Sequence, residues 1–253
     1  MESLRALVRP PAMSFIKALS PHPERNNIDP EKAILQHNAY CTALVEAGVE
    51  VVKLAPLEAF PDSTFIEDNA VILEGKAYLT TMKAPTRRGE SALFEAELKK
   101  HLPVETLDPP VFLDGGDVLK TNDAVFIGQS NRTGHEAIQY FQKKLKHPVI
   151  PVEVKNALHL KTAATWLGGN RLLVNPAGCD VNSFKDFDCV EVKAEDAYAA
   201  NCLVIGDEVI MPAGFKRVEE NLKNIGFTPH PVNMSEFEKA DGGITCLSLV
   251  FER

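Results

Sequence analysis

Several features that would indicate a particular class of protein are missing from this 253-residue chain. It has 27 Lys and Arg against 35 Asp and Glu, a formal charge of -8, so it lacks the basic excess with which proteins grip nucleic acid. No apolar run reaches the roughly 18 residues that a transmembrane helix requires. The segment MESLRALVRPPAMS lacks the apolar stretch of a signal peptide. These absences predict a cytoplasmic protein that binds neither nucleic acid nor membrane.

Cysteines are few and dispersed, and the common nucleotide-binding motifs are absent. The cysteines are Cys41, Cys179, Cys189, Cys202 and Cys246. Their odd number and unpaired spacing argue against a disulfide framework and against a zinc site. The patterns GxGxxG and GxxxxGK[ST] do not occur, and neither does the GxSxG elbow of serine hydrolases. We therefore expect reduced thiols and no dinucleotide or P-loop site.

Four segments carry the signals of helices. Residues 29–48 begin with Asp-Pro, the order expected of an N-cap and a first helical residue. Residues 133–145 begin with Thr133 and place Glu136 three positions later, which is the capping-box pattern. Residues 214–226 have apolar side chains at helical spacing and end at a glycine. Residues 89–102 form a weaker fourth case.

Between these helices one pattern recurs, in which two short apolar runs flank a polar or glycine-bearing turn. It occurs as NAVILEGKAYLT, GDVLKTNDAVFIG, TWLGGNRLLVNP and NCLVIGDEVIMP, and each predicts a β-hairpin. The chain ends, RALVRPPAMSF and ITCLSLVFER, could supply the halves of a fifth unit. Such repetition predicts a radial or stacked α/β repeat without a domain boundary. The alternative is an irregular α+β domain whose hairpins merely look alike.

Three stretches place carboxylates beside apolar strand residues: PDSTFIEDNAVIL, FLDGGDVL and ADGGITC. Any one of these acids could be a solvated turn residue. However, Glu67 and Asp68 are adjacent and directly precede a strand, so they cannot both simply point away from the sheet. The glycines after Asp114 allow the backbone close approach to a ligand. Together these acids predict a pocket that holds a cation.

His159 and Cys246 are the candidates for proton transfer and nucleophilic attack. Each taken alone is as well explained by a place in the core, since lone histidines and free cysteines are often buried structural residues. A cysteine, a histidine and a carboxylate that are close in space would instead form a nucleophile, its acid/base partner and the group that orients that partner. Spacing along the sequence leaves both interpretations open.

Six blocks of sequence carry a family resemblance. PDSTFIEDNAVI, APTRRGE, LDGGDVL, SNRTGHEA, LHLKTA and DGGITCLSL appear in the order found in dimethylarginine dimethylaminohydrolases, and the resemblance runs from about Ile16 to the carboxyl terminus. The resemblance implies the pentein fold, a five-bladed pseudo-symmetric α/β propeller of hairpin-plus-helix units around a central pocket. It also implies one catalytic domain over residues 1–253. This fold agrees with the repeats.

The resemblance further implies roles at matching positions. Cys246 would attack the guanidinium carbon, His159 would protonate the leaving amine and then activate water, and Asp114 would orient the histidine. The implied substrate contacts are Glu67 and Asp68 at the guanidinium, Asp62 and Asp241 at the amino group, Arg87 and Arg132 at the α-carboxylate, and backbone contacts from Leu19 and Ala240.

The implied reaction converts Nω-methylated arginine to citrulline and methylamine or dimethylamine through an S-alkylthiouronium intermediate on the cysteine, without metal or organic cofactor.

The region LSPHPERNNIDP and the Gly242-Gly243 pair do not map onto the family pattern. Substrate preference therefore stays open, with an arginine deiminase-like hydrolase as the alternative enzyme. A guanidino amino acid binding protein of the same fold is the non-enzyme alternative. The expected partner is a small guanidino amino acid, and a homodimer is compatible with the sequence.

Overall fold

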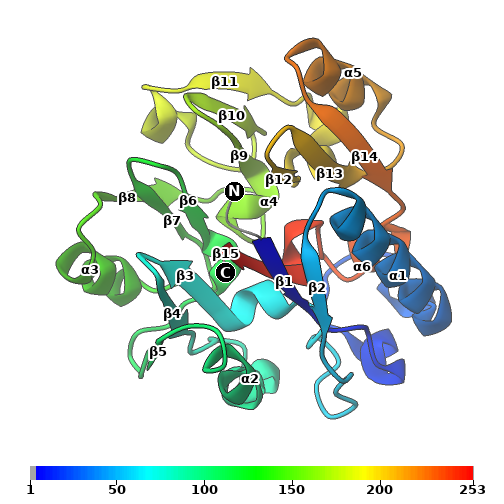
Figure 1. Cartoon of the computed structure of the whole chain (residues 1–253), viewed down its shortest axis with the longest axis vertical. Helices are drawn as coiled ribbons and strands as arrows, with labels where there is room; N and C mark the ends of the chain where they lie inside the picture. The colour runs from blue at the N-terminus through cyan, green and yellow to red at the C-terminus, as the bar shows by residue number, and fades with distance from the viewer. Residues whose placement is uncertain (1–3, 253) are drawn as a thin grey trace. The chain divides into compact units, whose positions relative to one another are not determined.

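The structure is a computed structural model that describes residues 4–252, so residues 1–3 and 253 of the expected domain lie outside it. The chain divides into two compact units. Figure 1 labels their helices and strands and colours the chain from blue at the amino end to red at the carboxyl end. Unit 1 holds the chain up to Glu67 and from Ile205 onward, and unit 2 holds Asp68–Val204. Among residues 4–252, none of the helices has the length and apolarity needed to cross a bilayer.

The strands belong to five three-stranded sheets. Unit 2 contains β3 (Ala70–Leu73), β4 (Lys76–Leu79) and β5 (Val104–Thr106); β6 (Val118–Lys120), β7 (Val125–Gln129) and β8 (Val149–Glu153); and β9 (Ala164–Gly168), β10 (Arg171–Val174) and β11 (Asp188–Glu191). Unit 1 contains β15 (Ser248–Glu252), β1 (Leu4–Val8) and β2 (Glu50–Lys53). The remaining sheet consists of β12 (Leu203–Ile205), β13 (Glu208–Pro212) and β14 (Thr228–Val232), and its first strand straddles the boundary between the units.

The sheets share one plan, which confirms the predicted repeat. A middle strand pairs antiparallel with the strand before it in the hairpin and parallel with a third strand, as in β3-β4-β5 and β6-β7-β8. The sheet β9-β10-β11 has the same pairing, and β13 pairs parallel with β14. In the turn from β3 to β4, Glu74 and Gly75 have φ of 49° and 73°, as the tight turn of a two-residue hairpin requires.

The fifth sheet is made from both ends of the chain, as predicted. β1 pairs antiparallel with β15 and parallel with β2. This pairing fixes the short 3-10 helix η8 (Thr245–Leu247), which carries Cys246, directly ahead of the last strand.

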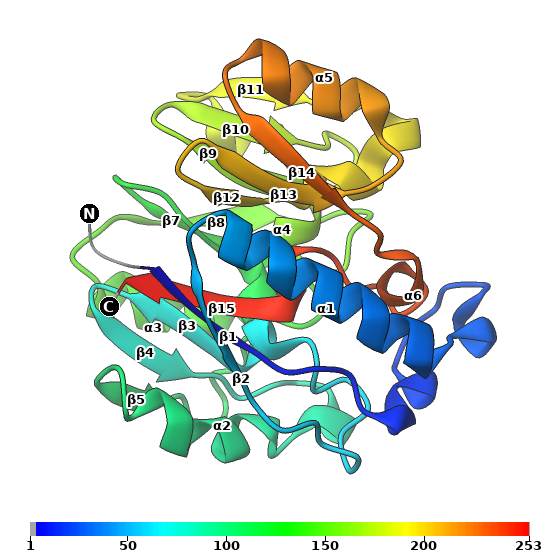
Figure 2. The ribbon, with the colours of Figure 1, turned by 45° about the vertical axis from the view of Figure 1, so that its right-hand side comes forward.

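The predicted helices are present, and each packs beside a sheet of its own unit. They are α1 (Pro30–Glu46), α2 (Glu90–Leu98), α3 (His135–Lys144) and α5 (Lys216–Asn224), with two single turns, α4 (Leu160–Ala163) and α6 (Ser235–Glu238). The Asp29 carboxylate accepts hydrogen bonds from the backbone N–H of Glu31 and Lys32, so the predicted cap of α1 is confirmed. Figure 2 shows α1 and α5 beside β14, which both helices contact.

The predicted capping box of α3 is wrong. The helix begins at His135 with Gly134 as its N-cap, and no side chain caps it. The Thr133 hydroxyl instead donates to the buried carboxylate of Asp117 at 2.6 Å. A buried carboxylate needs hydrogen-bond donors, and this need determines where the hydroxyl points.

Candidate active site

The proposed functional residues occupy equivalent places in the repeat. Asp68, in the 3-10 helix η3 (Ile66–Asn69), precedes β3, and Asp114 precedes β6. His159 precedes α4 and β9, while Cys246 precedes β15. In each of these four sheets the proposed functional residue lies just ahead of the first strand of the hairpin. The same position in the repeat thus carries all four residues.

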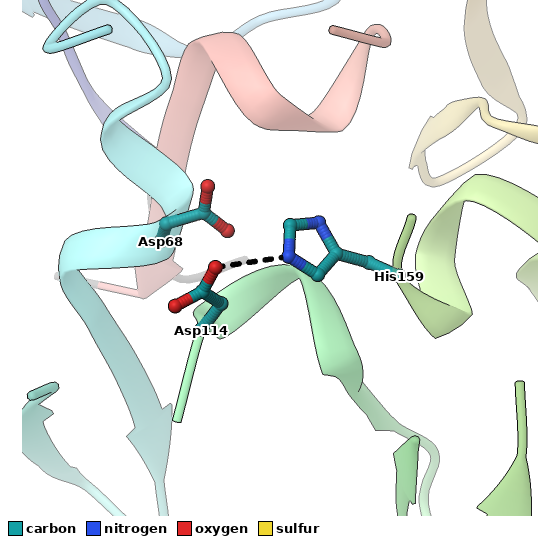
Figure 3. Close-up of side chains that lie close together, drawn as sticks. All are labelled: Asp68, Asp114 and His159. Carbon is teal, nitrogen blue, oxygen red and sulfur yellow. Dashed lines mark hydrogen bonds and ion pairs between the residues drawn. The ribbon is translucent and has the colours of Figure 1, made fainter. Parts of the chain in front are cut away.

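Unit 2 brings Asp68, Asp114 and His159 together (Figure 3). His159 Nε2 lies 3.1 Å from Asp114 Oδ2, and one polar atom from each of the three residues lies within 4.8 Å of the others. Asp114 is fully buried, and Asp68 and His159 are each 3% exposed. The hydrogen bond between His159 and Asp114 is the contact that we expected of a carboxylate that orients the histidine.

Glycine at position 116 lets these groups approach one another. A Cβ there would lie 2.6 Å from His159 Nδ1 and 2.8 Å from its Cγ, closer than real Cβ atoms come. The Gly116 backbone N–H also donates to Asp68 Oδ1 at 3.0 Å. The second glycine after Asp114 thus permits the close approach of the histidine.

The charges around His159 favour its protonated form. Burial lowers the pKa of His159, but the neighbouring carboxylates of Asp68, Asp117 and Asp114 outweigh burial and raise it to about 9. Burial would likewise raise the pKa of Asp68, whereas His159 and Arg87 lower it. An imidazolium beside the ionised carboxylate of Asp68 is therefore the expected state at neutral pH.

Arg87 lies behind Asp68 and is 4% exposed. Its Nη1 donates to Asp68 Oδ2 at 2.6 Å, and its Nε and Nη2 donate to the two carboxylate oxygens of Glu90 at 3.1 and 2.9 Å. Burial lowers the pKa of Arg87, but Glu90 and Asp68 raise it. Glu90 was not predicted, although it lies in the block APTRRGE three residues after the arginine.

Arg132 and Asp114 also lie close together. Arg132 Nη1 is 3.9 Å from Asp114 Oδ2, and the arginine side chain is 23% exposed. The second carboxylate oxygen of Asp114, Oδ1, is buried and has no hydrogen-bond partner within residues 4–252. An acceptor in this situation carries a desolvation cost that a bound donor would remove.

Unit 1 holds Cys246, which is 9% exposed. Its Sγ accepts a hydrogen bond from the backbone N–H of Gly243 at 3.3 Å. The neighbouring Thr245 hydroxyl donates to Glu67 Oε2 at 2.8 Å, so the loop that carries the cysteine is tied to an acid from the block PDSTFIEDNAVI. Thr245 was not anticipated, and its only sequence signal is its place next to the cysteine.

The other predicted residues of unit 1 fall in two places. Leu19 donates its backbone N–H to Asp62 Oδ1 at 3.0 Å, with Asp62 5% exposed and Leu19 38% exposed. Ala240 is buried after α6, and Asp241 has a φ of 57°, in the left-handed region. A Cβ on the following Gly242 would lie 2.2 Å from a ring atom of Phe65, so close packing requires glycine there.

Asp68, Asp114 and His159 are placed so that they could also hold a metal ion. A histidine binds metal through a neutral nitrogen, and the raised pKa of His159 opposes that form. The same acids suit an organic cation, because a guanidinium donates several hydrogen bonds in a fixed plane.

Comparisons with known proteins agree with this geometry. A family model described as N,N dimethylarginine dimethylhydrolase, eukaryotic, matches residues 15–177. The chain is 36% identical to N(G),N(G)-dimethylarginine dimethylaminohydrolase of Pseudomonas aeruginosa over 97% of this chain and 98% of the relative. It is 34% identical to the protein of that name from Streptomyces coelicolor, over 98% of this chain and 97% of the relative.

Two solved structures show the same architecture. The Pseudomonas aeruginosa protein, as a cysteine-to-serine mutant with citrulline, matches with a TM-score of 0.93 and 35% identity over 99% of this chain and 100% of its own. The N-terminal domain of a cyanobacterial arginine dihydrolase is 24% identical with a TM-score of 0.91, over 98% of this chain and 97% of its own, a likeness of fold alone. These matches confirm the predicted five-bladed pentein fold.

Arg87→Ala should lower the free energy of unfolding by about 3 kcal/mol, because it leaves the buried carboxylates of Asp68 and Glu90 without their cation. Arg88→Ala, at the exposed neighbouring position, is the matched control and should change it by less than about 0.5 kcal/mol. Chemical denaturation measures both. Equal effects of the two substitutions would contradict the buried ion pairs.

The raised pKa of His159 predicts a stability that depends on pH. Protonation favours the folded state, so the contribution is complete below pH 6.5 and is lost as the pH rises through 9. Relative to His159→Gln, the wild-type free energy of unfolding should therefore fall over that interval. Parallel curves for the two proteins would show that the histidine titrates normally.

Proposed function

The chain belongs to the dimethylarginine dimethylaminohydrolase family, and from this premise we propose that it hydrolyses Nω-methylated arginine to citrulline and methylamine or dimethylamine. The proposed reaction yields citrulline, the molecule bound to the Pseudomonas aeruginosa protein in its solved structure. A second solved structure, of a dimethylarginine dimethylaminohydrolase with a histidine-to-glycine change, is an adduct with S-methyl-L-thiocitrulline, an amino acid of the same class. The chain is thus a hydrolase of guanidino amino acids.

The observation that carries the proposal is the buried Asp114 Oδ1, which has no hydrogen-bond partner in the described chain, next to Asp68 and His159. A guanidinium N–H would satisfy this acceptor. Carboxylates that fix the guanidinium plane also localise its charge, which makes the central carbon easier to attack. Asp68 is held ready for this role by Arg87 and the Gly116 N–H.

Cys246 is the proposed nucleophile of the first step. Its thiolate forms a bond to the guanidinium carbon, the bond from that carbon to the methylated nitrogen breaks, and the His159 imidazolium supplies the proton that the departing amine needs. The Gly243 N–H, which already donates to the sulfur, stabilises the thiolate before attack. The product of this step is an S-alkylthiouronium.

Water completes the reaction. His159, now neutral, takes one proton from water as the oxygen bonds to the same carbon. The bond to sulfur then breaks and the remaining hydroxyl proton is lost to solvent, which releases citrulline and the thiolate. Asp114 keeps the imidazole oriented through both steps by its hydrogen bond to Nε2. The chemistry needs neither a metal nor an organic cofactor.

The amino acid end of the substrate is assigned by family position. Both arginines are assigned to the α-carboxylate, and Arg132 is partly exposed, as a ligand of the substrate would be. Arg87 also contacts Asp68 and Glu90, and its charge keeps Asp68 ionised. We assign Asp62 and Asp241 to the α-amino group, Glu67 beside Asp68 to the guanidinium, and Leu19 and Ala240 to backbone contacts.

We propose a single catalytic domain over residues 1–253, as the family resemblance implies. We place the protein in the cytoplasm, where thiols stay reduced. Its cysteines are free, and the proposed attack by Cys246 requires a free thiol. A small amino acid is the partner, with neither nucleic acid nor membrane involved, in a monomer or a homodimer.

Turnover decides between the candidate functions. Purified protein should release citrulline from asymmetric dimethylarginine or monomethylarginine faster than from arginine, measured as kcat/KM with a colorimetric citrulline assay. Faster release from arginine would favour the deiminase-like alternative. Citrulline from none of the three, together with tight binding of one of them, would establish a binding protein instead.

Cys246→Ser should lower kcat by at least about 1000-fold, because a hydroxyl is a far weaker nucleophile than a thiolate. Cys189→Ser, at a partly exposed cysteine outside the proposed site, should retain wild-type activity. Alkylation followed by mass spectrometry should label Cys246, and substrate should protect it. Protected labelling of Cys41 or Cys202 would refute the assignment.

A further inference from the structure

Asp117 is a fully buried carboxylate to which the mechanism above gives no role. It ends the 3-10 helix η5 (Gly115–Asp117), and its backbone N–H donates to the carbonyl of Asp114 at 3.0 Å. Burying an ionisable group is costly unless its oxygens accept hydrogen bonds. Both oxygens of Asp117 do so, and their donors come from two segments of the proposed site.

The first oxygen holds the backbone at the histidine. Asp117 Oδ1 accepts the backbone N–H of Leu160 at 2.9 Å. Leu160 follows His159 directly and is the first residue of α4, a turn whose start no side chain of His159 caps. Asp117 therefore fixes the peptide from which the imidazole extends.

The second oxygen holds the loop that carries Arg132. Asp117 Oδ2 accepts the hydroxyl of Thr133 at 2.6 Å and the hydroxyl of Ser130. Ser130 Oγ in turn accepts the backbone N–H of Arg132 at 3.0 Å and that of Thr133 at 3.3 Å. The backbone N–H of Asp114 also points to Thr133 Oγ1, at 3.4 Å.

The neighbouring strand leaves room for this arrangement. A Cβ on Gly128, in β7, would lie 2.5 Å from Asp117 Oδ1 and 2.9 Å from the Leu160 Cβ. Only glycine at this position lets the carboxylate reach the start of α4. The hydrogen bond from the Thr133 hydroxyl to Asp117 also explains why α3 lacks its predicted cap, because this hydroxyl is no longer available to the helix.

We propose that Asp117 is a positioning residue, one carboxylate that places both the backbone of His159 and the loop of Arg132. The role rests on the proposed function, because it assumes that His159 transfers protons and that Arg132 binds the substrate carboxylate. Removing the carboxylate should therefore affect proton transfer and substrate binding together, whereas removing one hydroxyl should affect mainly binding.

The imidazole of His159 is faced by three carboxylates, Asp68, Asp114 and Asp117, and two arginines, Arg87 and Arg132, contact the first two. Loss of the charge at position 117 lowers the pKa of His159, since this carboxylate is among the groups that raise it. The alkaline limb of the kcat profile, which reports the imidazolium, should move to lower pH in the same variant.

The test uses Asp117→Asn, which keeps the shape of the side chain but has one acceptor oxygen in place of two. It therefore cannot accept both the Leu160 N–H and the two hydroxyls. We expect kcat to fall about 10- to 100-fold, as for a small displacement of a catalytic group, with the alkaline limb displaced to lower pH. Ser130→Ala should raise KM about 2- to 10-fold, the effect of one lost hydrogen bond, and leave kcat within about twofold.

Asp123→Asn, in the exposed turn between β6 and β7, is the matched control and should leave kcat, KM and the pH profile unchanged. A folded Asp117→Asn protein with an unchanged pH profile would overturn the proposal. If Asp117→Asn does not fold, Ser130→Ala and Thr133→Val decide, and wild-type KM in both would overturn it.

The titration of His159, followed by NMR and assigned with His159→Gln, separates this proposal from the proposed function because it needs no turnover. A wild-type protein without activity, in which Asp117→Asn still lowers the pKa of His159, would refute the reaction while supporting the electrostatic part of the positioning role. Normal wild-type turnover with no change in that pKa would refute the positioning role alone.

Discussion

The buried hydrogen bond between His159 Nε2 and Asp114 Oδ2 is the interaction on which the rest of the site depends. An imidazolium without a hydration shell is stable only where carboxylates replace the water, and those carboxylates need their own partners. Arg87 and the Gly116 N–H supply them for Asp68. Each buried charge in turn needs a partner. Asp68 is paired with Arg87, and Arg87 is paired with Glu90.

The repeat explains why the residues proposed for catalysis lie at matching points along the chain. Each of these hairpins begins where the chain arrives from a turn or short helix, so the residue just ahead of the first strand lies outside the ladder of backbone hydrogen bonds. Asp68, Asp114, His159 and Cys246 all occupy this place. Four versions of one local structure therefore present two carboxylates, an imidazole and a thiol. The spacing of the hairpins in the sequence sets the spacing of these residues.

This regularity is why the hairpins, the main helices and the fifth sheet from both termini could be predicted from the sequence. Each rests on local signals, such as a turn glycine or the Asp-Pro start of α1, and the fold agrees with them. The third strand of each sheet was not predicted. β14, TPHPV, contains two prolines and reads as a loop, and only its parallel pairing with β13 makes it a strand.

Contacts between side chains were harder to predict, because a residue type does not determine which partner it takes. The resemblance assigned Arg87 to a substrate carboxylate and gave no sign of its bidentate contact with Glu90, and Thr133 was expected to cap α3 rather than to serve Asp117. In both cases a buried carboxylate determines the geometry. Burial is a property of the folded chain, so the sequence shows which acids are present but not which of them need donors.

The balance of formal charge among the site residues of unit 2 explains why this site suits a cation. The acids Asp68, Glu90, Asp114 and Asp117 face the cations Arg87, Arg132 and His159, which leaves one negative charge in excess. The buried Asp114 Oδ1 is the acceptor without a donor within residues 4–252 among these groups. A guanidinium supplies both the charge and the donor, whereas a neutral amide or urea supplies only the donor. Citrulline, once formed, has lost the charge that held its precursor, and this difference favours release of the product.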